Sequence, residues 1–531
     1  MGSPYYWRPL GRQLYFSLLG DVMVERPWIP AAIHAALFVA LALVLYRIGR
    51  RRFAPPIAAC LASFPLLGEP ARFLLGWPSG VENLLALVSV ALAVHETLAG
   101  RLLTAGLAAL AGVLSHEAAS LVLPLLPALA WWRTRRLPEA LPWAGVVLAV
   151  GGVEAIGHAI ARTHGMGMPS DAVTQVPWST WPVIVSQALA AQLNLEDAGD
   201  RTRLVFGSGY AVLFAMGLVL ALRRGARGRL RQAGPALVAG LVWFAAGLLP
   251  LLWVWPDWNG WRTTMPGLGL AVAVTGLLGL AWAPLAAAFV ALRLAALLVA
   301  PAAPATVATV APASVSQFSF PRLARLQRTV ESTRRALRVG APRLPRGATV
   351  RYWGLPQLTE FGFETALAAR VWYGDSTLAW GALGGASGVR ADAVIEFVRD
   401  QPWPARVVEP HAMRLLADAL EARQSGRAAT AESLMARAME AQPGPGGPFR
   451  ASVLQNRSRL AHDRGDRARA DSLNRICLDI NPDYADAWAL EAILALERGD
   501  RATAIAAVRR CLALEPRHDE GLRIAEALGG R

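Results

Sequence analysis

The chain has 531 residues, of which 54% are hydrophobic and only 17% are charged. So few charges exclude a chain made only of water-soluble domains, and the length leaves room for three or four domains at about 100 to 200 residues each. All 53 basic residues are Arg, the net charge of +15 is spread over both halves of the chain without a polybasic tail, and only three Cys are present, so the sequence predicts no binding to nucleic acid, no disulfide scaffold and no multi-Cys zinc site.

The first 304 residues contain a series of apolar segments of the length that a membrane span needs. A span takes about 20 apolar residues, because a helix rises about 1.5 Å per residue and the hydrocarbon core of a bilayer is roughly 30 Å thick. Two segments, 54–68 and 102–115, are short enough to be half-buried or re-entrant, so we expect a polytopic α-helical membrane domain over 1–304 with eight to ten spans. The ten segments are 28–46, 54–68, 83–99, 102–115, 117–132, 141–160, 204–222, 235–255, 266–282 and 284–304.

Clusters of Arg predict which ends of these spans face the cytoplasm, since short cytoplasmic loops carry the excess of basic residues. Such clusters follow the first, fifth and seventh segments, at 47–52, 133–136 and 223–231. All three fall on one side when the ten segments alternate, which puts everything after about residue 305 on the other side. Because Arg-only basic residues with abundant Ala, Gly and Pro are typical of a GC-rich bacterial genome, we expect a multi-pass protein of the bacterial inner membrane with an extracytoplasmic C-terminal part.

Residues 305–346 are predicted to form a linker followed by an amphipathic helix. The linker, up to about residue 320, is rich in Ala, Pro, Val and Ser. Within 320–339, Leu323, Leu326, Val330 and Leu337 recur at helical spacing among Arg residues. The apolar stripe of this helix is expected either to lie on lipid headgroups or to pack on the next domain.

Residues 347–407 mix two kinds of periodicity. Strand-like runs are ATVRYW at 348–353, TLAWGAL at 377–383 and ARVVE at 405–409, and a helix is expected around 360–372. We therefore predict a small mixed α/β element over this range.

Residues 408–531 contain a repeat with a period of 34 residues. Equivalent residues 34 apart are Gly465 and Gly499, Ala470 and Ala504, Cys477 and Cys511, and Pro482 and Pro516. This is the period of the tetratricopeptide repeat, a helix-turn-helix unit, and an earlier copy around Gly426 is offset by five residues inserted at 444–448. We expect an α-solenoid of three repeats with a capping helix at 518–528, which either binds a peptide on its concave face or packs on its own membrane domain.

The two Cys of this region occupy the same position in adjacent repeats. Equivalent points on stacked helices lie about 8–10 Å apart, which is beyond the reach of a disulfide. We therefore expect Cys477 and Cys511 to be free, buried thiols.

Ionisable residues at the edge of a membrane domain are costly and are therefore candidates for function. On the predicted outer side, a carboxylate can act as general base on an acceptor hydroxyl, and Arg can pair with a departing phosphate. Together these groups suit transfer from an anionic lipid-linked donor, although Glu69 and Glu82 can also be solvated loop acids and Arg72 can snorkel to a headgroup. The outer ionisable residues are Arg8, Asp21, Glu25, Glu69, Arg72, Glu82, His116, Glu117, Asp257 and Arg262.

Five motifs follow one another along residues 1–285. They are YYWRPLGRQLYFSLLG at 5–20 with His34 after it, Pro65 with Glu69, WPSGVENLL at 77–85, Ser115-His116-Glu117, and Arg262 with Pro266 and Gly269. In order and spacing they resemble the motifs of GT-C fold membrane glycosyltransferases. The resemblance is to the protein O-mannosyltransferase-like group in particular, whose members carry tetratricopeptide repeats after their spans.

The resemblance implies transfer of a sugar from a polyprenyl-phosphate-linked donor to a protein or cell-envelope glycan outside the cytoplasm. It implies Glu69 and Glu117 as catalytic carboxylates, and Asp21 is a third candidate because it lies on the same predicted side. No cofactor other than the lipid-linked donor is implied, and no cluster of metal-ligand spacing is present. The candidate substrate-binding residues are Arg8, Trp77, Asn83, His116 and Arg262.

The chain departs from this family in two places. The family's first transmembrane helix and its Asp-bearing outer loop lie upstream of the Arg-Pro-Leu stretch at which this sequence starts, and His116 stands where the family has Lys. These departures predict either a natural start further upstream or a degenerate member of the family. The alternative function is accordingly a catalytically inactive, membrane-anchored scaffold whose repeats bind periplasmic proteins. A transporter is a third possibility, but it calls for two similar halves with discontinuous spans, and the sequence lacks such symmetry.

Overall fold

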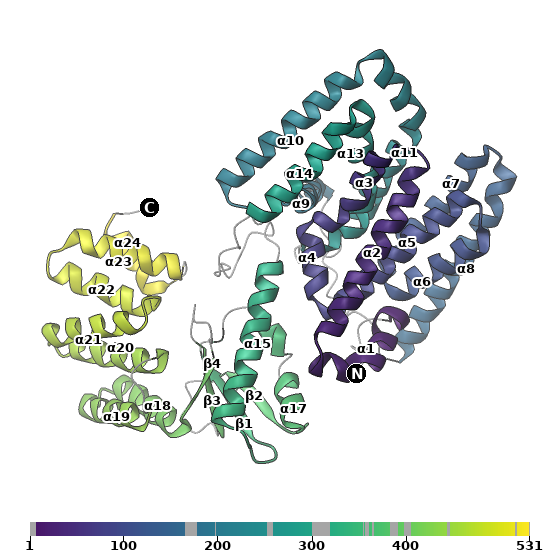
Figure 1. The fold of residues 1–531 in the computed structure, drawn as a ribbon. Coiled ribbons are helices and arrows are strands. Elements are labelled where there is room, and N and C mark those ends of the chain that lie inside the picture. The colour runs from purple at the N-terminus through teal and green to yellow at the C-terminus, as the bar shows by residue number, and fades with distance from the viewer. Residues whose placement is uncertain are drawn as a thin grey trace. The chain divides into compact units, whose positions relative to one another are not determined.

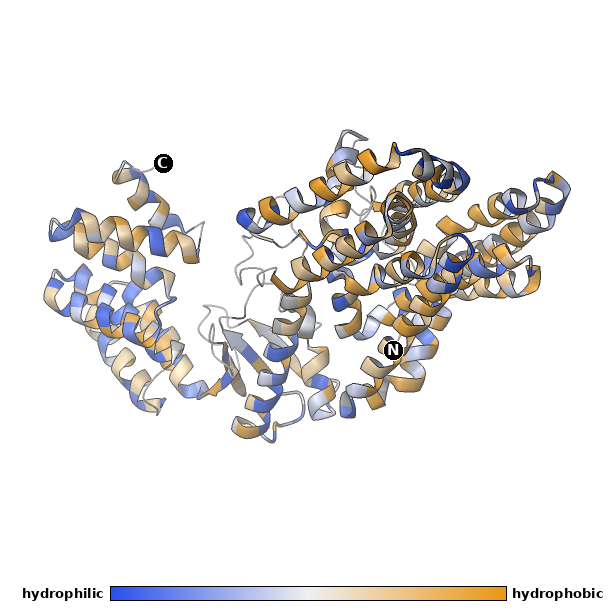
Figure 2. Cartoon of the chain, turned by 45° about the horizontal axis from the view of Figure 1, so that its top comes forward, coloured by the Kyte–Doolittle hydropathy of each residue, from blue (hydrophilic) through white to orange (hydrophobic). Residues whose placement is uncertain are grey.

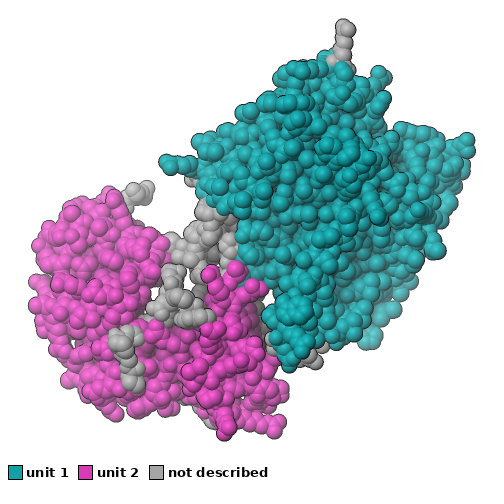
Figure 3. Space-filling model, in the orientation of Figure 1, with its two compact units in different colours: residues 1–304, 311–323 teal, residues 305–310, 324–531 magenta. Residues whose placement is uncertain are grey.

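The computed structural model divides the chain into two compact units (Figure 3). The first unit is Met1–Pro304 with Ala311–Leu323, and the second is Ala305–Val310 with Ala324–Arg531. Helices predominate in both units. The structure describes residues 7–164, 178–196, 198–251, 259–299, 319–353, 355, 360–363, 366–382, 391–397, 405–442, 447–515 and 518–529.

The first unit is a bundle of apolar helices (Figures 1 and 2). By length and composition, five stretches of the described chain can each cross a membrane: α2 (Trp28–Arg50), Pro78–Ala99 with α5 (Val81–Ala99), α8 (Leu137–Thr163), Arg201–Ala221 in α10 (Asp200–Ala221), and Gly260–Ala281 with α13 (Thr264–Ala281). A sixth candidate is the pair Pro55–Leu67 and Glu69–Gly76, which is bent by 56°. The other helices are α1 (Tyr15–Glu25), α3 (Pro55–Ser63), α4 (Glu69–Gly76), α6 (Leu102–Ser115), α7 (Leu125–Thr134), α9 (Trp181–Gln192), α11 (Arg224–Leu248) and α14 (Ala283–Val299).

The expectation of eight to ten spans is thus met in part. Of the ten expected segments, 102–115, 117–132 and 284–304 correspond to helices shorter than a bilayer requires: α6 has 14 residues, α7 has 10 and α14 has 17. The segment 102–115 was already expected to be half-buried or re-entrant, and 235–255 lies in part outside the described residues and is not among the candidate spans. The segment 54–68, expected to be half-buried or re-entrant, is the first arm of the bent pair. Five or six candidate spans are therefore what the described residues support.

Close helix crossings in this unit rely on Gly. Where α11 and α13 cross, a Cβ on Gly240 would lie 2.6 Å from the carbonyl oxygen of Gly269, so only Gly lets the two backbones approach this closely. This crossing anchors α13, whose N-terminus carries the one-turn helix Gly260–Thr263 and with it Arg262.

The second unit contains a four-stranded sheet of order β2-β1-β3-β4. Strand β1 (Thr349–Trp353) is parallel to β2 (Ala379–Ala382) and to β3 (Ala393–Phe397), and β3 is antiparallel to β4 (Ala405–Val408). The runs predicted as strands are β1, β2 and β4, and the helices α16 (Glu360–Phe363) and α17 (Leu367–Tyr373) occupy the range expected to be helical. The prediction missed β3, whose five residues are all buried.

Both faces of this sheet are covered by helices. On one face, Leu337 of α15 (Phe320–Gly340) shares a core with Val350 and Ile395. On the other, Val394 and Val408 pack with α18 (Pro410–Gln424). The amphipathic helix predicted at 320–339 therefore packs on the sheet through its Leu337 end.

The rest of the second unit is made of antiparallel helix pairs (Figure 1). The chain reverses at Gly426, Gly465 and Gly499, each with a positive φ of 70 to 78°, a conformation that costs Gly little. Asp466 and Asp500, 34 residues apart, cap the helices that follow by accepting backbone N–H bonds. Cys477 and Cys511 are free and buried, as expected. The pairs are α18 with α19 (Ala428–Ala441), α20 (Pro448–Asp463) with α21 (Arg467–Ile480), and α22 (Ala485–Glu497) with α23 (Arg501–Leu514), and α24 (Asp519–Ala527) follows them.

Candidate functional site

A charge cluster lies at one end of the first unit, with Arg8 and Glu82 buried and Glu117 partly exposed. Arg8 donates from Nε to Glu117 Oε2 over 2.7 Å, from Nη2 to Glu117 Oε1 over 2.5 Å, and from Nη1 to Glu82 Oε1 over 2.6 Å. The cluster forms because the backbone at Gly11, just after Arg8, lies directly against the start of α5 and the end of α6. Only Gly fits there, since a Cβ on residue 11 would lie 2.6 Å from the Ser115 carbonyl oxygen. Residues distant in sequence thus share one ionic network.

The contacts within this network determine the protonation states of Arg8 and Glu117. Burial opposes the charge on Arg8, but its hydrogen bonds and proximity to Glu117 and then Glu82 outweigh that effect and raise its pKa above the usual value. Burial would likewise raise the pKa of Glu117, but His116 and Arg8 outweigh burial and hold it well below the usual range. Glu117 is therefore an ionised carboxylate at neutral pH.

His116 is a neutral hydrogen-bond donor in this network. Burial lowers its pKa to about 4; Glu117 opposes this shift, while the charges of Arg8 and Arg262 add to it. Nδ1 accepts the Ala118 N–H over 3.1 Å, so the single proton of the neutral ring resides on Nε2. At neutral pH the side chain offers this N–H without a net charge.

An aromatic cluster adjoins Arg262. The Arg262 guanidinium lies 5.4 Å from the ring centroid of Trp261, and Trp261 is stacked on Phe73 at 6.2 Å and lies 5.4 Å from Trp77. The predicted residues Trp77 and Arg262 are therefore joined through Trp261. Asn83, the third residue of α5, is buried.

Glu69 is held at the first residue of α4. Its N–H donates to Asn194 Oδ1 over 2.8 Å, while Asn194 Nδ2 donates to the carbonyl oxygens of Leu67 and Arg293. Its Oε1 accepts the Phe320 N–H over 3.0 Å, and its Oε2 lies 3.3 Å from Arg72 Nη1. The bend between the two arms of the broken helix pair is thus fastened around the Glu69 backbone.

The structure distinguishes between the interpretations open for the acidic residues. Glu82 is only 3% exposed, and the Glu69 side chain only 16%, so the interpretation of both as solvated loop acids is wrong. Arg72 pairs with Glu69 and lies over the Phe320 ring at 4.6 Å. The backbone of Asp21 belongs to α1, but its side chain lies outside the described residues, as does all of Asp257.

Sequence reasoning missed Asn194 and Arg293, which act together. Arg293 of α14 is fully buried, donates from Nε to the Gln192 carbonyl oxygen over 2.8 Å, and lies 3.7 Å over the Phe64 ring. The available signal was an Arg inside an apolar segment, which is costly unless it is paired. Asn194 had no such signal, because only the fold brings it to Glu69.

No protein-family model matches the chain, and no curated protein is significantly similar to it. Within the described part of the chain, no group of three or more His, Cys, Asp or Glu is placed to hold a metal ion. The function must therefore be argued from the geometry of the site.

Proposed function

We propose that the protein is a GT-C type membrane glycosyltransferase of the bacterial inner membrane, which moves a sugar from a polyprenyl-phosphate donor to a protein or glycan acceptor outside the cytoplasm. The observation that carries the proposal is the Arg8–Glu82–Glu117 network at one end of a unit with five or six candidate spans, in which Arg8 and Glu82 are buried. Buried ionisable groups in a membrane domain are expensive to maintain and mark functional sites.

The proposed reaction forms one bond and breaks another. The acceptor oxygen attacks C1 of the sugar while a carboxylate accepts its proton, and the bond from C1 to the phosphate oxygen breaks with both electrons leaving on the phosphate. Arg262 and the Nε2–H of His116 are suited to hold that phosphate, because one supplies charge and the other a hydrogen bond. The rings of Trp77 and Trp261 offer a stacking surface for the sugar.

We assign the general base to Glu69 and a positioning role to Glu117. Both oxygens of Glu117 bond to Arg8, and its low pKa makes it a weak base, whereas an effective base has a pKa near the working pH. Glu69 accepts a bond from a neutral backbone N–H and a longer one from Arg72. Arg8 is correspondingly engaged by carboxylates, which favours Arg262 over Arg8 as the phosphate partner.

Transfer in proteoliposomes tests the proposal. The purified protein is mixed with radiolabelled polyprenyl-phosphate mannose or glucose and a cell-envelope extract, and incorporation into the acceptor fraction is measured. We expect Glu69→Gln to lower the rate about 100-fold or more, the usual loss for a general base. Glu139→Gln removes a carboxylate that is half exposed and paired with Arg136 at the surface, and should leave the rate unchanged.

Two results would count against the proposal. If the wild type transfers neither sugar above the level of the Glu69→Gln variant, the transferase assignment fails. If Glu69→Gln and Glu139→Gln behave alike while the wild type is active, only the assignment of the base fails.

The helix pairs of the second unit support a role in acceptor binding. We propose that they form tetratricopeptide repeats on the extracytoplasmic side, because the caps Asp466 and Asp500 and the turns Gly465 and Gly499 recur at 34 residues. The same pairs favour the second candidate function, a catalytically inactive scaffold that displays the repeats. A wild type without transfer activity that still captures an envelope protein through the repeats would support the scaffold.

A further inference from the structure

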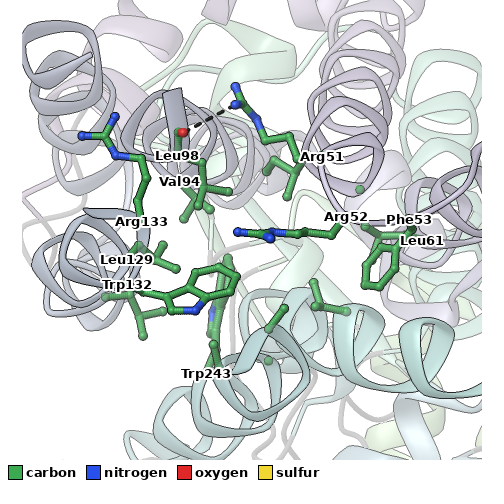
Figure 4. Close-up of a pocket in the computed structure, with 17 residues that line it drawn as sticks. Arg51, Arg52, Phe53, Leu61, Val94, Leu98, Leu129, Trp132, Arg133 and Trp243 are labelled. Atoms are coloured by element: carbon green, nitrogen blue, oxygen red, sulfur yellow. Dashed lines mark hydrogen bonds between the residues drawn. The ribbon is translucent and has the colours of Figure 1, made fainter. Parts of the chain in front are cut away.

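A cleft of about 290 Å³ opens at the end of the first unit opposite to the charge cluster (Figure 4). Its walls come from α2, α3, α5, α7, α11 and α13 and are mainly aliphatic, with Leu98 and Leu129 among them. Glu82 and Leu98 are 16 residues apart in α5, which corresponds to about 24 Å along the helix. The cleft is therefore separate from the candidate active site, and its binding properties are independent of the proposed function.

Three Arg side chains, Arg51, Arg52 and Arg133, line this cleft. The Arg52 guanidinium lies 4.6 Å from the ring centroid of Trp132, and Figure 4 shows it reaching across the cleft toward that ring. Arg51 donates to the Leu98 carbonyl oxygen over 3.4 Å, and Arg133 lies against Gly100. Arg51 Nη2 also lies 3.4 Å from His95 Nε2, and His95 is in turn bonded to Glu96. None of the three guanidinium groups contacts a carboxylate of the described chain directly.

Among the described residues, none of these three Arg side chains forms an ion pair with an acid. No Asp or Glu oxygen of the described residues comes within 4.0 Å of the three guanidinium groups, and the ion pairs at this end involve His95, Arg101 and Arg136 instead. Like charges held around one apolar cleft repel each other. The arrangement is therefore complementary to an anion with an apolar portion.

We propose that the cleft binds an anionic phospholipid from the adjoining bilayer leaflet. The phosphate would accept hydrogen bonds from Arg51, Arg52 and Arg133, because guanidinium groups match phosphate oxygens in geometry and charge. The start of one acyl chain would lie along Leu98 and Leu129. Since α2 and α5 are themselves candidate spans, the mouth lies where lipid headgroups meet a membrane-spanning bundle, and basic pockets between such helices bind anionic headgroups.

The size of the cleft limits what enters it. Pockets for whole drug-sized ligands begin near 300 Å³, so this cleft admits a headgroup and the first part of one chain, while the remainder of the lipid stays in the bilayer. The rings of Trp132 and Trp243 line it and suit this boundary, because Trp favours the interface between headgroups and chains.

Native mass spectrometry of the full chain in detergent tests the proposal. Titration with phosphatidylglycerol and with phosphatidylcholine of the same chains measures whether the anionic lipid binds more tightly. We expect phosphatidylglycerol to bind at least about tenfold more tightly, and Arg52→Gln/Arg133→Gln to remove most of that preference, because charge-assisted hydrogen bonds are lost. Arg47→Gln/Arg136→Gln removes two charges from the same end without touching the cleft and should keep the preference.

Further arms separate the outcomes. Leu129→Trp fills the apolar wall and keeps all three Arg, and it should weaken phosphatidylglycerol binding without abolishing folding, as judged by thermal unfolding. Inorganic phosphate alone should compete poorly, and polyprenyl phosphate should bind no more tightly than phosphatidylglycerol. Equal affinity for the two phospholipids, an unchanged preference in Arg52→Gln/Arg133→Gln, or equal binding of free phosphate would overturn the proposal.

Discussion

Arg8 holds together the charged end of the first unit. It contacts Glu82 and Glu117, which lie 74 and 109 residues further along the chain. Glu82 is almost fully buried, whereas the Glu117 side chain is 42% exposed, so the pair with Glu82 is the one that depends most on Arg8. A buried charge without its partner is strongly destabilising.

Replacing Arg8 should therefore destabilise the first unit. We expect Arg8→Met to lower the free energy of unfolding by about 3 kcal/mol, because Glu82 is left buried without a counter-charge. Thermal unfolding in detergent measures this loss. As a control, Arg101→Met breaks the ion pair with Glu96, in which the Arg101 side chain is 67% exposed. It should change the free energy of unfolding by less than about 1 kcal/mol.

Rescue identifies the cause of the loss at Arg8. In the double variant Arg8→Met/Glu82→Gln the uncompensated charge is gone, so part of the stability should return. If Glu82→Gln adds a further loss to Arg8→Met, the ionic explanation is wrong and Arg8 acts through packing.

At the scale of an element, strand β3 shows why a central strand escaped prediction. Its sequence AVIEF has no alternation of polar and apolar residues, because it is buried on both faces, as strands between two covered faces are. The edge strands β2 and β4 have partly exposed residues and gave recognisable runs. Glu396 also obscured β3, since a carboxylate is unexpected in a buried strand.

Glu396 predicts a pH dependence of the second unit. Burial raises its pKa to about 8, although Arg406 on the neighbouring strand opposes the shift. Because the folded pKa lies above the unfolded value near 4.5, the folded state retains a proton that the unfolded state loses, and stability falls as pH rises from about 4.5 to 8, by up to about 1.4 kcal/mol per unit.

Glu396→Gln should remove this dependence. Thermal unfolding followed by circular dichroism at pH 6 and pH 9 should show a smaller fall in Tm for the variant than for the wild type. Glu421→Gln makes the same chemical change at an exposed position and should behave like the wild type. A fall of equal size in all three proteins would contradict a neutral Glu396.

At the scale of the whole molecule, the Arg clusters predict how the first unit crosses the membrane. Helix α8 has 27 residues and spans about 40 Å, more than the hydrocarbon core. Cysteines introduced as Glu139→Cys and His164→Cys, in a Cys60→Ser background, would mark its two ends, while Cys477 and Cys511 are fully buried. We expect a membrane-impermeant maleimide to label Glu139→Cys from the cytoplasmic side and His164→Cys from the opposite side; labelling of both from one side would refute the spanning assignment.

The sequence by itself determined those features of the fold that depend on a local or periodic pattern of residues. Apolar length marked the helices of the first unit, the 34-residue period marked the helix pairs, and helical spacing marked α15, because each pattern is complete within one segment. The candidate residues were found by their type and position, but not their partners. Only the tertiary structure decided that Arg8 pairs with Glu82 and Glu117, that the Asn194 side chain bonds to the Glu69 backbone, and that Arg51, Arg52 and Arg133 line one cleft. These contacts join segments distant in the chain, and burial and electrostatic pairing arise only when the fold brings such segments together.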